Sequence, residues 1–167
     1  SDHRRQRQMC IRDSTITVSR LIFTQEVNEA FDRLEDGDDN AMKDLLQKQL
    51  DQLKGIIEAV NGKLEKLDRK KVLTLCTIDV HARDTCQKLI DEKVDVADAF
   101  QWSSQLRYGT NEKTGKLQIN VCDAEIPYMY EYIGSPGCLV ITPLTDRCVI
   151  TLTQAQRLVL GGAPAGP

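Results

Sequence analysis

The residues closest to a known binding pattern are the glycines and prolines at the end of the sequence, where residues 158–167 read LVLGGAPAGP. Gly166 and Pro167 can open a phosphate loop of the type G-x-x-x-x-G-K-[ST], whose backbone N–H groups surround phosphate oxygens. The second glycine and the lysine of that pattern would follow Pro167. Composition and spacing alone therefore leave a phosphate loop as one interpretation of these residues.

A second candidate for chemistry is His81, which has two carboxylates near it in the sequence. Asp79 is two residues away and lies off the helical face of His81, whereas Asp84 is three residues away. No nucleophile accompanies them. The sequence therefore favours a partly exposed structural histidine over a catalytic one.

The cysteines are scattered, and because no two form a C-x-x-C pair and only two histidines are present, a structural zinc site is disfavoured. We expect Cys122, near a strand end, and Cys148, on an apolar helix face, to be small buried hydrophobic residues. Reduced thiols in a cytosolic compartment fit this pattern better than the alternative, a disulfide framework. The six cysteines are Cys10, Cys76, Cys86, Cys122, Cys138 and Cys148.

The charge balance gives no sign of a nucleic-acid or anionic-membrane surface. The formal net charge is −3, from 25 acidic and 22 basic residues that are mixed along the chain. No apolar run approaches the roughly 20 residues needed to span a bilayer, so we expect a soluble chain. The length of 167 residues allows one domain or parts of two.

The element that must position the C-terminal glycines is a helix that begins after residue 142. Thr142 can be its N-cap, Pro143 its first residue, and Asp146 lies at the positive end of its dipole. Gly161 and Gly162 are expected to end it. Apolar residues spaced by four, four, three and four predict one buried face, formed by Leu144, Cys148, Leu152, Ala155 and Val159.

The first part of the chain reads as helical, apart from a tail. Residues 1–14 are basic and lack an apolar period, so they are either a translated adaptor or assembly scar or a disordered tail. Helical spacing begins at Phe23 within residues 15–34, where a β-branched run leaves the start open, and an acidic turn follows at residues 35–40. Residues 72–89 resume helical spacing.

The clearest periodic stretch is a heptad-like seam, which predicts one helix over residues 46–67. Its functional interpretation is a coiled coil between two chains, and the alternative is a helix packed in the bundle of its own domain. Leu45 and Ile56 widen the apolar stripe, which favours the bundle. The seam consists of Leu46, Leu50, Leu53, Ile57, Val60, Leu64 and Leu67.

Short strands are predicted after a joint at residues 94–99. Residues 100–107, which include Trp102, form a short helix or an extended edge. Residues 116–122 alternate in polarity and predict a half-buried strand, with residues 106–108 pairing to it as a hairpin. Residues 126–132 contain three tyrosines, and Pro127 indicates an edge position; a turn is expected at residues 135–137.

Several blocks of this sequence resemble dynein heavy chains, and the axonemal, outer-arm type most closely. The blocks are FQWSSQLRY at 100–108, YEYIGS at 130–135, LVITPLTDRC at 139–148, LTQA at 152–155 and LGGAPAGP at 160–167. The match is loose from Leu45 and dense over the last seventy residues. The chain departs from the family at Gly109 and Val149, where aromatic residues are usual, and at Gln156 and Arg157, which replace a more apolar pair.

The resemblance implies a fold and a division of the chain. The fold class is α+β and mostly α, with a helical linker bundle, a small β-hairpin region and the N-terminal helix of a truncated P-loop AAA+ module. Residues 1–14 are then a non-native or disordered tail, residues 15–122 the C-terminal part of the dynein linker, and residues 123–167 the start of the first AAA+ module. That division ends at the beginning of the phosphate loop.

The resemblance also implies which residues meet the nucleotide. Leu139, Val140 and Ile141 would supply apolar contacts to adenine, and Pro143 and Leu144 would shape the pocket. Gly166 would be the first glycine of the phosphate loop. The alternative for residues 139–141 is a plain buried strand. No catalytic or metal-binding residue is expected in this stretch.

The implied activity is that of a minus-end-directed microtubule motor that uses ATP and Mg²⁺ in the intact chain. The 167 residues lack the phosphate-loop lysine, so we expect no hydrolysis by them alone. Implied partners are the rest of the motor ring, microtubules through the stalk, and dynein intermediate and light chains, in the cytoplasm, the cytoskeleton and the axoneme of a cilium or flagellum. The alternative function is a helical or coiled-coil scaffold or adaptor.

Overall fold

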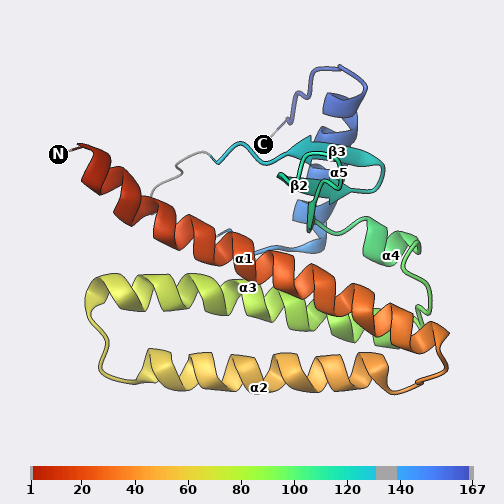
Figure 1. Ribbon diagram of the computed structural model, residues 1–167, viewed down its shortest axis with the longest axis horizontal. Helices are drawn as coiled ribbons and strands as arrows, with labels where there is room; N and C mark the ends of the chain where they lie inside the picture. Colours follow the sequence, from red (N-terminus) through yellow and green to blue (C-terminus); the bar gives the residue numbers. More distant parts are fainter. Residues whose placement is uncertain (1, 131–138, 166–167) are drawn as a thin grey trace.

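The computed structural model describes residues 2–130 and 139–165, and of residues 2–13 and 67 it describes the backbone alone. Five helices and three strands follow one another in the order α1, α2, α3, α4, β1, β2, β3, α5 within this part of the chain. Figure 1 shows the long helices as one layer, with the small sheet and α5 (Pro143–Arg157) above it. The predicted fold class, α+β and mostly α, is confirmed.

The helical layer is built from α1 (Asp2–Glu35), α2 (Ala41–Asn61) and α3 (Lys66–Asp91). Helices α2 and α3 form a hairpin, and α1 crosses over it diagonally (Figure 1). The connection between α1 and α2 turns at Gly37, whose φ of +95° lies in the left-handed region that glycine adopts most readily. Arg33, in the last turn of α1, binds the carboxylates of Asp38 and Asp44 and so fixes this turn.

Helix α1 starts at Asp2, so in the structure residues 2–14 continue the helix that carries residues 15–35. The sequence pattern had set residues 1–14 apart as a tail, and that division stays a prediction. His3 and Cys10 have side chains outside the described part.

The core lies where the three helices converge on Trp102, which is only 1% exposed. Trp102 belongs to the short helix α4 (Phe100–Ser103), as one of the two sequence-based interpretations predicted. Its ring meets Phe23 edge to face, with centroids 6.0 Å apart, and also contacts Phe31. Its indole N–H donates to Asn28 Oδ1 at 3.1 Å, so the buried polar atom is satisfied.

The predicted continuous helix over residues 46–67 is wrong, because α2 ends at Asn61 and the chain reverses at residues 62–65. Leu64 lies in this connection and Leu67 on α3. Leu53 is buried, whereas Ile57, its neighbour along the predicted seam, is 45% exposed. The buried face packs against α1 and α3 of the same chain, so the prediction of a bundle helix is confirmed.

The sheet has the strand order β1–β2–β3 and is antiparallel throughout, with β1 (Arg107–Thr110), β2 (Leu117–Val121) and β3 (Ala124–Pro127). The predicted hairpin is confirmed, since Tyr108 stands opposite Ile119. Pro127 ends β3 at the edge of the sheet, as predicted. The predicted half-buried strand is confirmed as β2, which is half-buried along most of its length, but its burial does not alternate, since Val121 alone among its residues is fully buried.

Helix α1 lies along the other edge of the sheet. The backbone N–H of Tyr108 donates to Thr24 Oγ1 at 3.1 Å, so a side chain of α1 takes the place of a neighbouring strand. Thr17 Oγ1 donates to Tyr128 Oη at 3.0 Å just beyond β3. These contacts fix the sheet on the helical layer. No helix in the described part of the chain is long and apolar enough to cross a membrane.

Candidate nucleotide-binding segment

The N-terminus of α5 is fixed by a capping box. Thr142 has extended backbone angles, and its hydroxyl accepts from the N–H of Thr145 at 3.3 Å. The Thr145 hydroxyl in turn accepts from the N–H of Thr142 at 3.3 Å. Pro143 is the first helical residue and Asp146 lies in the first turn, as the sequence predicted. The capping box therefore fixes the start of α5, and with it the end of the preceding segment, at Thr142.

Five of the six predicted site residues lie together around this cap. Leu139 and Leu144 are each 71% exposed, Val140 is 64% exposed, Pro143 is exposed and Ile141 is half-buried. Residues 139–141 are not in a strand, so the alternative of a buried strand does not hold in this structure. The sixth residue, Gly166, lies outside the described residues.

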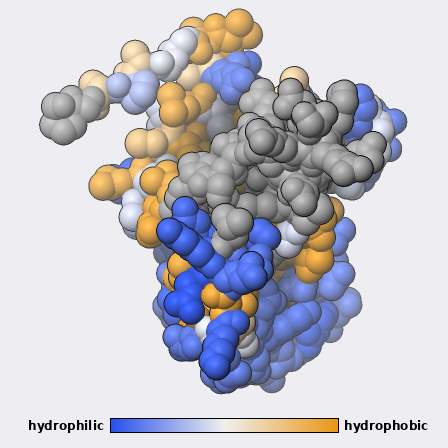
Figure 2. Space-filling view, turned by 90° about the vertical axis from the view of Figure 1, so that its left-hand side faces the viewer, coloured by the Kyte–Doolittle hydropathy of each residue, from blue (hydrophilic) through white to orange (hydrophobic). Residues whose placement is uncertain are grey.

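The prediction that the apolar face of α5 is buried is wrong. Cys148 is exposed rather than buried, Val159 is 91% exposed, and no described residue of the helix is fully buried. The half-buried positions include Ile150 and Gln154, because α5 lies with that side toward the β2–β3 hairpin. Figure 2 shows hydrophobic surface gathered over α5 and the segment after it, and hydrophilic surface over the α2–α3 hairpin below.

Helix α5 also ends earlier than predicted. Its last residue is Arg157, and the reversal falls on Val159, whose φ is +57°, before Gly161 and Gly162 are reached. The N–H of Leu160 donates to the carbonyl of Ala155 at 2.8 Å, which closes the helix end. The glycine pair predicted as the stop signal therefore lies in the segment beyond the turn.

The contacts of α5 with the sheet were not predicted from the sequence. Gln154 Nε2 donates to the carbonyl oxygen of Val121 at 3.1 Å, and Arg157 lies 3.3 Å from the Asp123 carboxylate. Cys122, between Val121 and Asp123, has a φ of +49° and is half-buried rather than fully buried. The one sequence feature that pointed to these contacts was Arg157, a charged residue at a position where the dynein pattern is more apolar.

His81 is half-buried on α3, near enough to Asp146 of α5 to feel its charge. Burial lowers the pKa of His81 and the nearby Arg20 lowers it further, whereas Asp146 of α5 and Asp84 raise it. The prediction of a partly exposed structural histidine fits this environment.

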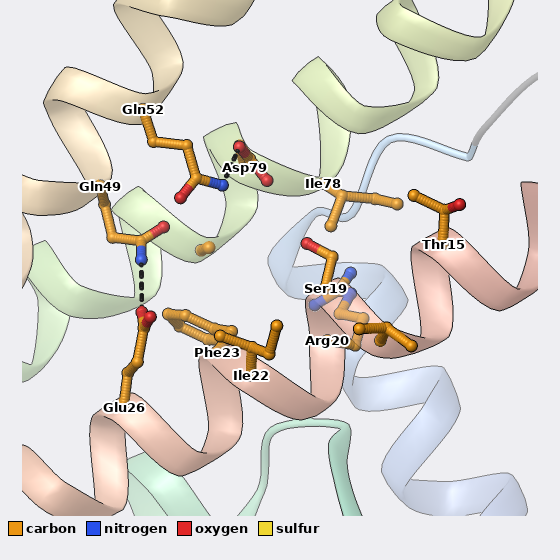
Figure 3. A pocket seen from close by; sticks show the side chains of 12 residues that line it. Thr15, Ser19, Arg20, Ile22, Phe23, Glu26, Gln49, Gln52, Ile78 and Asp79 are labelled. Atoms are coloured by element: carbon orange, nitrogen blue, oxygen red, sulfur yellow. Dashed lines mark hydrogen bonds between the residues drawn. The ribbon is translucent and has the colours of Figure 1, made fainter.

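A separate pocket of about 270 Å³ lies inside the helical layer (Figure 3). Gln52 Nε2 donates to Asp79 Oδ2 at 2.7 Å, and Gln49 Nε2 donates to Glu26 Oε2 at 3.2 Å. Burial raises the pKa of Asp79, while the Gln52 hydrogen bond and the charge of Arg20 lower it. Both carboxylates are thus held by neighbouring helices, and their role is to join α1, α2 and α3.

Among the described residues, no group of three or more His, Cys, Asp or Glu side chains is placed to hold a metal ion. The described thiols of Cys76, Cys86, Cys122 and Cys148 are free. Cys138 and the turn expected at residues 135–137 lie outside the described part, as does most of the YEYIGS block.

The family described as the hydrolytic ATP binding site of dynein motor region matches residues 128–167. The flagellar outer-arm dynein beta chain of Chlamydomonas reinhardtii is 64% identical over 154 residues, which is 92% of this chain and 3% of that protein. The chain belongs to the dynein heavy-chain family. It spans about 3% of the length of this dynein relative.

Other dynein heavy chains extend the comparison. Human dynein axonemal heavy chain 9 is 53% identical over 152 residues, covering 91% of this chain and 3% of that protein. The outer-arm dynein alpha chain of Chlamydomonas reinhardtii is 43% identical over the same length, again 91% of this chain and 3% of that protein. The identity is thus higher with the beta chain than with the alpha chain of one organism, and the predicted resemblance to axonemal dyneins is confirmed.

Proposed function

We propose that this stretch joins the linker of an axonemal dynein to its first AAA+ module. In the whole heavy chain, ATP binding and hydrolysis would drive minus-end-directed movement along microtubules. The proposed linker part is residues 15–122 and the proposed module part is residues 123–167. The family match supports this division, since its residues 128–167 all lie within the proposed module part. The Thr17–Tyr128 hydrogen bond joins the two parts.

The observation that carries the proposal is the exposed aliphatic run beside the capped end of α5. Leu139, Val140 and Ile141 would contact adenine, and Pro143 and Leu144 would shape the pocket around it. Burial of aliphatic area contributes about 25 cal/mol per Å², so exposed side chains of this size have apolar contact to gain from the base. When bound, the triphosphate and Mg²⁺ supply the phosphoryl-transfer chemistry. Gly166 would begin the loop that surrounds the phosphates.

The proposed partners and place follow from the same assignment. The partners are the rest of the motor ring, microtubules through the stalk, and the intermediate and light chains of a dynein complex. The place is the axoneme of a cilium or flagellum, within the cytoskeleton and cytoplasm. Support comes from relatives whose names are those of axonemal, ciliary and flagellar dyneins.

The adenine assignment is tested by Val140→Asp and Ile141→Asp in a motor-length heavy chain. Neighbours on an extended segment point to opposite sides, so at least one of the two should face the base. An unpaired carboxylate buried against the ring costs about 3 kcal/mol, which weakens binding roughly a hundredfold. Titration with a fluorescent ATP analogue measures the dissociation constant.

The matched control is Val96→Asp, which places the same charge on a side chain that is 47% exposed and lies in the connection between α3 and α4. It should bind like the parent. If Val140→Asp and Ile141→Asp both keep the circular dichroism spectrum and the affinity of the parent, the assignment of residues 139–141 to adenine is wrong.

A further inference from the structure

The turn between β2 and β3 lies against the C-terminal half of α5 (Figure 1). Gln154 donates its side-chain N–H to the carbonyl oxygen of Val121, the last residue of β2, at 3.1 Å. Val121 is fully buried and Gln154 is half-buried, so water is partly excluded from this hydrogen bond. Arg157 and Asp123 add an ion pair at 3.3 Å, but their side chains are 50% and 82% exposed. Exposed pairs contribute little, so of these two polar contacts the Gln154 hydrogen bond is the stronger.

The segment that follows α5 folds back onto the same turns of the helix. The N–H of Leu160 donates to the Ala155 carbonyl at 2.8 Å, and the N–H of Val159 donates to the Gln156 carbonyl at 3.0 Å. Gly162 then lies so close to Leu152 that a Cβ at Gly162 would overlap Leu152 Cδ2. The residues leading to Gly166 are therefore in direct contact with the turn of α5 that precedes Gln154.

These contacts form one continuous path from the sheet, through Gln154 and α5, to the segment at Gly162. We propose that Gln154 is a positioning residue. Through it, the β2–β3 hairpin holds in place residues 158–165, the segment that leads to the phosphate loop. The inference rests on the proposed function, because that proposal begins the phosphate loop at Gly166, directly after this segment. Gln154 itself does not touch the nucleotide.

A link of this kind acts in both directions. If the hairpin fixes α5 where the nucleotide loop binds phosphate, then bound nucleotide must also stabilise the contact between α5 and the hairpin, because a coupling free energy is reciprocal. Val121, the acceptor in this contact, belongs to the part that we assign to the linker, whereas β3 belongs to the proposed module part. Gln154 thus joins the segment near the nucleotide site to a linker residue through one hydrogen bond.

The test uses Gln154→Met in a motor-length heavy chain, since methionine has a similar length and favours helices but has no donor. Loss of this one hydrogen bond should weaken binding of a fluorescent ATP analogue about fivefold. Gln154→Lys keeps a donor on a long side chain and should bind close to the parent. Gln156→Met, at an exposed position of the same helix, is the matched control and should bind like the parent. Equal affinities for Gln154→Met and Gln156→Met would overturn the inference.

A second measurement needs no variant. In the parent motor, ATP should slow amide hydrogen exchange in peptides that cover residues 121–124, because the bound state stabilises the hairpin contact. Unchanged exchange there, in a parent that binds ATP, would overturn the role of Gln154 and leave the proposed function intact. A parent that does not bind ATP at all would instead contradict the proposed function.

Discussion

At the scale of single residues, burial separates side chains that the sequence pattern treats alike. Val140 and Leu139 are aliphatic and more than half exposed, whereas Val121 and Val27 are aliphatic and fully buried. The first pair lies beside a helix cap and the second pair in packed elements. This contrast is why we assign the exposed pair to ligand contact and the buried pair to structure.

Cys86 lies within the helical spacing of residues 72–89, and Cys148 lies on the apolar face predicted for α5. The structure buries Cys86 completely in the core and exposes Cys148 on α5. Periodicity identifies the apolar face of a helix, but it does not identify the element that covers that face. The error at Cys148 comes from this limit, as does the error for the whole predicted face of α5.

The buried thiol of Cys86 gives a prediction for pH. Burial, together with the charge of Glu26, raises the pKa of Cys86 to about 12, so the folded state keeps the proton where the unfolded thiol, near 9, loses it. The stabilisation is present below pH 9 and is lost as the pH rises toward 12. We expect the free energy of unfolding to fall over this window, and to fall less steeply in Cys86→Ala.

Denaturant titrations of the 167-residue chain at several pH values from 7 to 11 measure this slope. Cys148→Ala, which removes an exposed thiol, is measured beside it as a control for the loss of a cysteine. A parent and a Cys86→Ala variant with equal slopes would contradict the buried position of Cys86.

At the scale of elements, the sequence predicted those features that depend on neighbouring residues, such as helix caps and hairpins. The capping box at Thr142, the position of Pro143 and the hairpin of β1 and β2 were all predicted from residue type and spacing. The end of α2 was missed because the heptad spacing continues through Leu64 and Leu67 while the chain reverses. Gly62, which weakens a helix by about 1 kcal/mol relative to alanine, was the available signal for that break.

The corrected boundary of α2 makes a prediction that compares two residues of the seam. Leu53 is buried between helices, so Leu53→Ala should lower the free energy of unfolding by about 2–5 kcal/mol. Ile57 is 45% exposed, so Ile57→Ala should cost about 1 kcal/mol or less. Denaturant unfolding of both variants, on the same helix and four residues apart, measures the difference.

A coiled-coil seam would give a different result. Both residues would then be buried between two chains, both substitutions would be costly, and stability would depend on protein concentration. Equal losses for Leu53→Ala and Ile57→Ala would contradict the bundle. Light scattering of the parent over a wide concentration range provides a second check on its mass.

At the scale of the whole molecule, the contacts that join the parts connect residues far apart in the sequence. Thr17 binds Tyr128 across 111 positions, and Gln154 binds Val121 across 33. Neither pair has a spacing that a single sequence reveals, because long-range contacts follow from how packed elements meet. The family resemblance predicts the order of the parts along the chain, and the structure shows which side chains make contacts between them.

The central claim is that residues 139–144 lie against the adenine of bound ATP. Photolabelling of a motor-length heavy chain with an azidoadenine analogue of ATP, followed by mass spectrometry of its peptides, tests this directly. We expect adducts within residues 139–144 that disappear when excess ATP competes. Competable labelling elsewhere in the first AAA+ module, with none in residues 139–144, would contradict the claim.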